Sequence, residues 1–76
     1  MTAASQTRGT VGIVGLGLVG QALAQRLHAA GFACVGYDLQ ASACERFAHT
    51  GGELAASPAK LAQRARAIIL AVLNTS

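Results

Sequence analysis

The sequence predicts an α/β fold in which a parallel sheet carries helices on both faces. Short apolar runs alternate with amphipathic segments along the chain, and the connections between them are short. The apolar runs have the length of strands that are buried on both sides. A βαβαβαβ order with right-handed crossovers favours the strand order 3-2-1-4. This is a partial doubly wound (Rossmann-type) sheet, one half of that fold plus one strand.

The first two strands and the helix between them have the clearest signals. Residues 10–14 form a short apolar strand, and residues 33–38 form a second. Between them, apolar residues recur at three- and four-residue spacing, so we expect a helix that ends at Gly31, in the usual C-terminal cap position. The expected apolar face of this helix consists of Val19, Ala22, Leu23, Leu27 and Ala30.

The next segment predicts a second helix. Ser42 can cap its start, because Glu45 stands three positions later and can reach back. The helix should end near His49, and Gly51 or Gly52 should turn the chain out of it.

The last third of the chain predicts a third helix between two strands. Residues 53–56 form a weak strand, and Ser57 and Pro58 then provide a capping hydroxyl and a first-turn proline. We expect this helix to run to about Arg66. Residues 67–73 form the most apolar run, which predicts a strand with an uncovered apolar side at an open edge.

The composition limits the classes of function. A length of 76 residues allows one small domain, and 53% hydrophobic residues exclude a disordered chain. The six basic residues are scattered and aromatic residues are few, which argues against nucleic-acid binding. No apolar run approaches the length that crosses a membrane. Cys34 and Cys44 lack the spacing of a zinc site, so we expect small buried thiols in a soluble, cytoplasmic protein.

A glycine-rich motif of the form G-x-G-x-x-G links the first strand to the first helix. Gly15 would permit a tight turn, Gly17 would let the backbone approach a pyrophosphate, and Gly20 would let the helix lie close to the sheet. The amides of Leu18 and Val19 would then face the phosphates at the positive end of the helix. The alternative is a packing turn that holds no ligand, since tight strand-to-helix turns favour glycine.

An acidic residue, Asp38, closes the second strand at about the spacing that a ribose contact requires. Its carboxylate can accept hydrogen bonds from both ribose hydroxyls. A 2′-phosphate about 4 Å away would be repelled by about 4 kcal/mol at an effective dielectric near 20. Leu39 and Gln40 follow, so no arginine stands there to receive such a phosphate. The sequence therefore predicts NAD rather than NADP, with a turn or cap role for Asp38 as the alternative.

The end of the last apolar run completes the candidate site, because ligands of such sheets lie beyond the carboxyl ends of the strands. The candidate cofactor-binding residues are Gly15, Leu16, Gly17, Leu18, Val19, Gly20, Asp38, Leu73 and Asn74. His28 and His49 have no carboxylate or serine partner at a telling spacing. We therefore assign no catalytic residue and no metal ligand.

The order of these motifs resembles the amino-terminal part of the β-hydroxyacid dehydrogenases, the family of 3-hydroxyisobutyrate dehydrogenase and tartronate semialdehyde reductase. The counterparts of the family pattern are GLGLVG at residues 15–20, Gly31 with Val35, the pair Gly51 and Gly52, the pair Ser57 and Pro58, and AVLN at residues 71–74. Departures from the usual residues stand at Val19, Arg26, Phe32, Ala67 and Asn74.

The resemblance implies an amino-terminal NAD-binding fragment of an oxidoreductase that transfers hydride between nicotinamide and a small hydroxyacid or sugar acid. It also implies a homo-oligomer in the full-length form. The family's substrate-binding segment and catalytic lysine would lie beyond Ser76. We therefore expect a mobile tail over residues 1–9 and an incomplete dinucleotide-binding domain over residues 10–76. The alternatives are a small NAD(H)-binding regulatory module without catalysis and a remnant that binds nothing.

Overall fold

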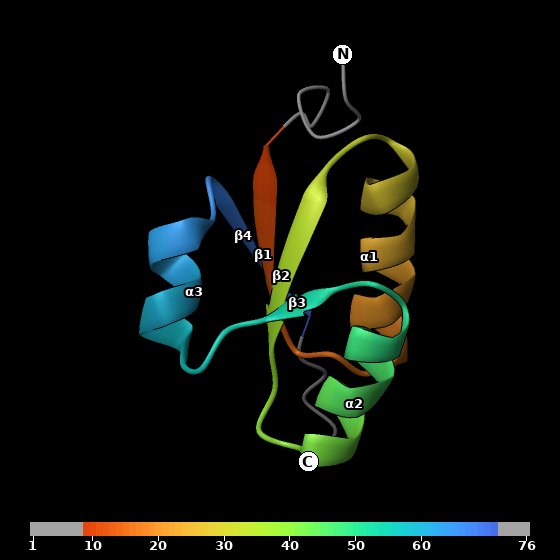
Figure 1. Cartoon of the computed structure of the whole chain (residues 1–76), viewed down its shortest axis with the longest axis vertical. Coiled ribbons are helices and arrows are strands. Elements are labelled where there is room, and N and C mark those ends of the chain that lie inside the picture. The colour runs from red at the N-terminus through yellow and green to blue at the C-terminus, as the bar shows by residue number, and fades with distance from the viewer. Residues whose placement is uncertain (1–8, 72–76) are drawn as a thin grey trace.

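The computed structural model describes residues 9–71, in which strands and helices alternate (Figure 1). The elements in chain order are β1 (Thr10–Val14), α1 (Leu18–Ala29), β2 (Ala33–Tyr37), α2 (Ala41–His49), β3 (Glu53–Leu54), α3 (Pro58–Arg64) and β4 (Ala67–Leu70). The strands form a parallel sheet of order β3-β2-β1-β4. The predicted fold class and strand order are confirmed.

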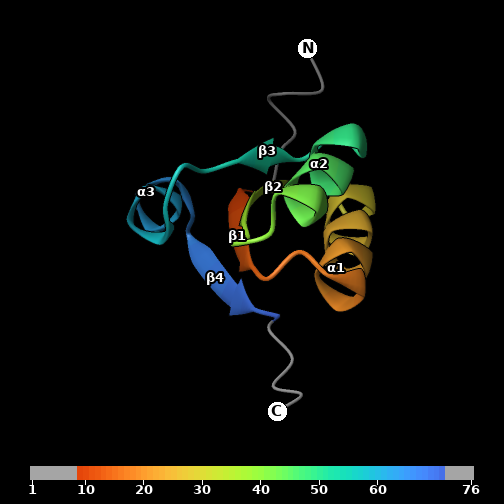
Figure 2. The same cartoon turned by 90° about the horizontal axis from the view of Figure 1, so that it is seen from below.

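Helices cover both faces of the sheet. Figure 2 shows α1 and α2 on one side of the strands and α3 on the other. The larger part of the core lies under α1 and α2, where Ile13, Leu16 and Phe47 are fully buried. On the opposite face, Leu61 of α3 packs over Gly12, where an added Cβ would lie 2.4 Å from the Leu61 side chain. The sheet is thus buried on both sides near its centre, as its apolar strands require.

The first two helices end as the sequence predicts, with a glycine in the left-handed region of φ. Gly31 has φ +98° and follows α1, and Gly51 has φ +92° and follows α2. In each case the amide of the next residue bonds back into the last turn, from Phe32 to the Leu27 carbonyl at 2.9 Å and from Gly52 to the Phe47 carbonyl at 3.2 Å. This is the Schellman arrangement, in which glycine avoids a strained Cβ.

The third helix begins as predicted and ends earlier. The Ser57 hydroxyl accepts a hydrogen bond from the Lys60 amide at 3.1 Å, and Pro58 occupies the first turn. The helix ends at Arg64 and not at Arg66. The Arg66 amide instead donates to the Thr10 carbonyl at 2.8 Å, which aligns the chain for β4 before that strand begins.

The predicted cap of the second helix is wrong. Helix α2 begins at Ala41 with Gln40 as its N-cap residue and no side-chain cap, so Ser42 lies inside the helix and not before it. The reason is the Asp38 carboxylate, which accepts the Gln40 amide at 2.8 Å and turns the chain two residues earlier.

The buried face of α1 also differs from the prediction. Gly20 and Ala24 are the buried positions, and Leu23 and Leu27 are half-buried. The predicted face residues Val19, Ala22 and Ala30 are exposed. Small residues face the sheet because they allow the helix to approach it closely. The spacing of large apolar residues does not predict that small residues occupy the buried face.

β4 occupies an open edge, as the sequence predicts. Among the described strands it pairs with β1 alone, and Ile68 and Leu70 are 46% and 70% exposed. The rest of the predicted strand, including Leu73, lies outside the described residues. Within the described part of the chain, no helix combines the length and apolarity needed to cross a bilayer.

Candidate functional site

The loop between β1 and α1 is held by two backbone features. Gly15 has φ +102°, a conformation that side-chain-bearing residues rarely adopt, and its amide donates to the Tyr37 carbonyl at 2.9 Å. Gly20 lies directly against the same loop, since a Cβ added there would lie only 1.9 Å from the Gly15 carbonyl oxygen. Both glycines are therefore required by the fold itself.

Gly17 differs from these two glycines, because the protein leaves the space beside it open. It is the N-cap residue of α1, and a Cβ added there would meet no atom within 4 Å. No side chain of the described residues caps this end, and the first turn contains no acidic residue. The amides of Leu18 and Val19 thus open a helix whose positive end is free to face an anion.

Asp38 joins this loop to the turn after β2. One carboxylate oxygen, Oδ2, accepts the Leu16 amide at 2.6 Å, and the other, Oδ1, accepts the Gln40 amide at 2.8 Å. A carboxylate oxygen has two lone pairs, so each oxygen keeps one acceptor site after these bonds. The half-buried Asp38 can therefore structure the turn and still accept two hydroxyl groups.

A cleft of about 340 Å³ lies between the glycine loop and the end of β2. Its lining residues are Gly15, Gly17, Leu18, Val19, Asp38, Leu39, Gln40 and Ala71. Five of the predicted site residues are thereby brought together. Leu16 and Gly20 are buried beneath the loop and do not line it. Leu73 and Asn74 lie outside the described residues.

Sequence reasoning missed three residues of this cleft, Leu39, Gln40 and Ala71. Leu39 and Gln40 enter the sequence prediction only through the positive charge they lack, although they directly follow Asp38 at the carboxyl edge of the sheet. Leu39 is 90% exposed, so its side chain offers an apolar surface at the cleft. Their position immediately after a strand end was the available signal.

The chemistry of the cleft is that of binding. Asp38 is the one titratable residue among those that line it within the described chain. The described residues also contain no cluster of three or more histidine, cysteine, aspartate or glutamate side chains that could hold a metal ion. An exposed helix start beside a carboxylate suits a ligand that carries both a phosphate group and a diol.

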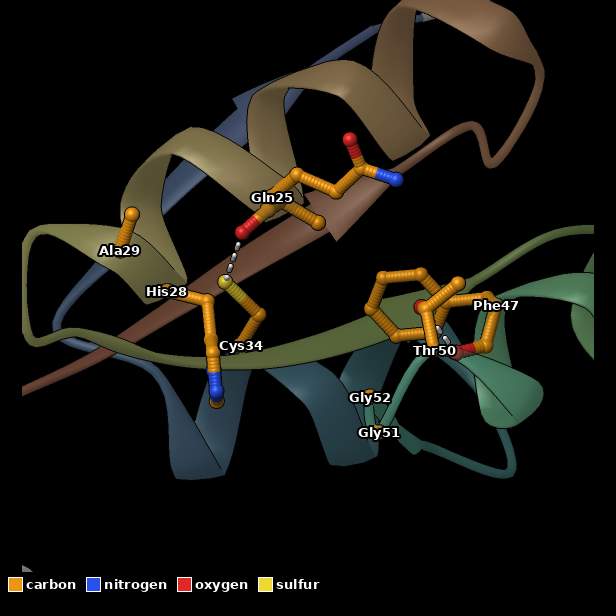
Figure 3. A pocket seen from close by; sticks show the side chains of 9 residues that line it. Gln25, His28, Ala29, Cys34, Phe47, Thr50, Gly51 and Gly52 are labelled. Atoms are coloured by element: carbon orange, nitrogen blue, oxygen red, sulfur yellow. Dashed lines mark hydrogen bonds between the residues drawn. The ribbon is translucent and has the colours of Figure 1, made fainter.

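A second cavity of about 170 Å³ lies between α1 and α2, near the other end of β2 (Figure 3). In it, Phe47 and Thr50 lie across from His28 and Cys34 (Figure 3). The Cys34 thiol donates to the Ala24 carbonyl, with the sulfur 3.8 Å from the oxygen. Burial raises the pKa of this thiol above its ordinary value, because the thiolate would lose its hydration. The cavity therefore presents a neutral thiol and is separate from the glycine loop.

We expect Cys34 to react slowly with iodoacetamide in the folded chain. The thiolate is the reactive form, and the raised pKa together with burial lowers its amount at pH 7.5. Alkylation followed by peptide mass spectrometry should show a rate at least about tenfold below that of the same cysteine in the denatured chain. The rate should keep rising with pH beyond the ordinary thiol pKa of 9.0. Equal rates in the folded and denatured chains would contradict this expectation.

Comparisons with known proteins agree with this geometry. L-threonate dehydrogenase of Cupriavidus necator is 41% identical over 64 residues, which are 84% of this chain and 22% of the relative. Mitochondrial 3-hydroxyisobutyrate dehydrogenase of Homo sapiens is 37% identical over 59 residues, which are 78% of this chain and 18% of the relative. The chain thus spans about a fifth of the length of these curated relatives. The predicted resemblance to hydroxyacid dehydrogenases is confirmed.

Solved structures and a family pattern agree as well. A phosphoglycerate oxidoreductase from Vibrio cholerae superimposes with a TM-score of 0.79 at 28% identity, over 92% of this chain and 22% of that one. An imine reductase from Pseudomonas sp. shares the fold, with a TM-score of 0.76 at 23% identity over 84% of this chain and 22% of that one. Residues 10–76 match the pattern described as the NAD binding domain of 6-phosphogluconate dehydrogenase. With its glycine loop, its acidic strand end and this match over most of its length, the chain belongs to that family of dinucleotide-binding domains.

Proposed function

We propose that this chain holds NAD as the cofactor-binding part of a hydroxyacid dehydrogenase, with residues 10–76 as its amino-terminal dinucleotide-binding segment. The observation that carries the proposal is the cleft in which Gly17, the open start of α1 and the Asp38 carboxylate meet. The pyrophosphate would lie on the amides of Leu18 and Val19, and the Asp38 oxygens would accept the adenosine ribose hydroxyls.

The described residues fit such a group. No contact among the described residues requires a glycine at position 17, since a Cβ there would meet no atom within 4 Å, whereas a phosphate close to the backbone would favour it. When bound, the cofactor supplies the nicotinamide that accepts or donates hydride. The residues of this chain bind and orient the adenosine and phosphate half.

We propose NAD over NADP because Asp38 carries negative charge where a 2′-phosphate would lie, and the exposed neighbours Leu39 and Gln40 carry no positive charge. A small hydroxyacid is the proposed substrate class, since the relatives include an L-threonate dehydrogenase and 3-hydroxyisobutyrate dehydrogenases. The complete enzyme would be a homo-oligomer. A cytoplasmic location fits the two unpaired cysteines, because reducing compartments keep thiols free.

Calorimetric titration of the 76-residue chain with NAD, NADH and NADP tests the proposal. We expect saturable binding of NAD and NADH, and binding of NADP weaker by more than about tenfold. Gly17→Val should abolish NAD binding, because its side chain would fill the open space beside the helix start. Gly51→Asn is the matched control, since it replaces a glycine outside the cleft with a residue that tolerates positive φ.

Two results would contradict the proposal. One is the absence of saturable heat with millimolar NAD, and the other is equal affinity of Gly17→Val and the unchanged chain. An activity assay with 3-hydroxyisobutyrate and L-threonate tests whether this chain binds the cofactor without catalysing the reaction. We expect binding of cofactor without turnover, because Asp38 is the one ionisable side chain among the described residues that line the cleft, and the proposal assigns it to the ribose.

A further inference from the structure

We propose that Asp38 is a positioning residue that fixes the glycine loop in its phosphate-binding shape before any nucleotide arrives. This inference rests on the proposed function and goes beyond a ribose contact. It makes the Asp38 carboxylate necessary for binding the pyrophosphate, a part of the ligand that the carboxylate does not touch.

The contacts of the Leu16 peptide carry the inference. Leu16 lies in the middle of the glycine loop, and its amide donates to Asp38 Oδ2 at 2.6 Å across a sequence separation of 22 residues. Its side chain is fully buried, and its carbonyl accepts a hydrogen bond from the Gln21 side-chain amide at 3.0 Å. Asp38 therefore anchors the loop through the Leu16 amide, next to the bond from the Gly15 amide to the Tyr37 carbonyl at the end of β2.

The same carboxylate fixes the other wall of the cleft. Asp38 Oδ1 accepts the Gln40 amide at 2.8 Å, so a single side chain ties the glycine loop to the turn that carries Leu39 and Gln40. A carboxylate suits both bonds because its two oxygens only accept, and bonds from backbone amides to a charged acceptor are among the stronger ones. Asparagine has one acceptor oxygen, and its amide group would face one of the two N–H donors.

Removing the carboxylate separates positioning from simple electrostatics. Asp38 places a negative charge beside the start of α1, so loss of that charge alone should strengthen the binding of an anion there. Loss of the anchor at Leu16 should weaken it, because the amides of Leu18 and Val19 would no longer be held together. For a ligand that carries phosphate and no ribose, the two explanations thus predict changes in affinity of opposite sign when Asp38 is replaced.

Inorganic pyrophosphate and ADP-ribose are the probes, and Asp38→Asn is the variant. Glu45→Gln is the matched control, because it removes the same charge from an exposed position on α2 that does not line the cleft. Affinities are measured by calorimetry at a temperature where all chains are folded. Hydrogen exchange of the Leu16 amide is measured by NMR without ligand, with the Leu61 amide on α3 as an internal reference.

We expect Asp38→Asn to weaken pyrophosphate binding by at least about fivefold and to speed exchange of the Leu16 amide by at least about tenfold. Exchange at Leu61 should not change, which distinguishes a local effect from general destabilisation. Glu45→Gln should neither speed exchange of the Leu16 amide nor weaken pyrophosphate binding.

Unchanged or stronger pyrophosphate binding by Asp38→Asn, with weaker ADP-ribose binding, would overturn the positioning role and leave a ribose contact alone. If the unchanged chain binds neither probe, the proposed function fails, and the Leu16 exchange rate still decides the inference. Equal Leu16 exchange in the unchanged chain and in Asp38→Asn overturns it without any ligand.

Discussion

Phe47→Ala should leave the chain largely unfolded at room temperature. The Phe47 ring is fully buried, and it fills space left by two glycines, because a Cβ added at Gly36 or Gly52 would lie 2.8 or 2.3 Å from the ring. Truncation of a buried phenylalanine costs about 3–5 kcal/mol. A chain of this length has a total stability of about 4–11 kcal/mol, and small domains lie at the lower end.

Urea or thermal unfolding followed by circular dichroism measures this effect. Phe32→Ala is the matched control, since it deletes the same ring from a half-buried position after α1. We expect the control to remain folded with a smaller loss of stability. Equal losses for the two variants would show that the cluster under α1 and α2 is not the main core.

Gly20→Ala should lower both the stability of the chain and its affinity for NAD. The new Cβ would lie 1.9 Å from the Gly15 carbonyl oxygen, a backbone atom that can move only with the whole loop. Overpacking of this kind costs about 1–3 kcal/mol and occasionally more, and here the displaced segment is the glycine loop that we propose binds the phosphates. We expect a lower unfolding midpoint and at least about a tenfold weaker affinity for NAD.

Gly17→Ala is the matched control for Gly20→Ala. It adds the same methyl group three residues earlier, where no protein atom lies within 4 Å. Its effect on stability should stay within about 1 kcal/mol, the usual range for a change at an N-cap residue. Calorimetry and unfolding curves should therefore separate Gly20, which the fold needs, from Gly17, which we propose serves the ligand. A larger loss of stability in Gly17→Ala than in Gly20→Ala would contradict this division.

Most of the fold could be predicted because its signals are local. Short apolar runs indicated the strands, Gly31 and the pair Gly51 and Gly52 indicated the helix ends, and Ser57 with Pro58 indicated the start of α3. Each of these signals acts through the backbone of its own segment. The strand order then followed from the handedness of the crossovers.

Two of the errors arise from contacts that the capping pattern and the apolar spacing do not describe. Ser42 has every local property of a cap, but Asp38 turns the chain first. The buried face of α1 centres on Gly20 and Ala24 because the helix lies against the glycine loop, a contact that hydropathy does not encode.

Most residues of the candidate site could be predicted, but the hydrogen bonds between them could not. The spacing from the glycines to Asp38 indicated a ribose contact, and the structure places both at one cleft. The bond from the Leu16 amide to Asp38 was not foreseen, since the motif describes how each residue meets a ligand and not how the residues hold one another. Leu39, Gln40 and Ala71 were missed because the glycine motif names no residue after the strand ends, where these three line the cleft.

β1 is one of the two inner strands of the sheet, and it is synthesised before the other three described strands. Val11 of β1 pairs with Cys34 of β2 on one side and with Ala67 of β4 on the other. A ribosome adds about 5–20 residues per second, so several seconds pass between the synthesis of β1 and that of β4, its second neighbour in the sheet. Such late closure slows folding and leaves an apolar β1 edge exposed in the nascent chain. That edge is where a co-translational chaperone would have the most to protect.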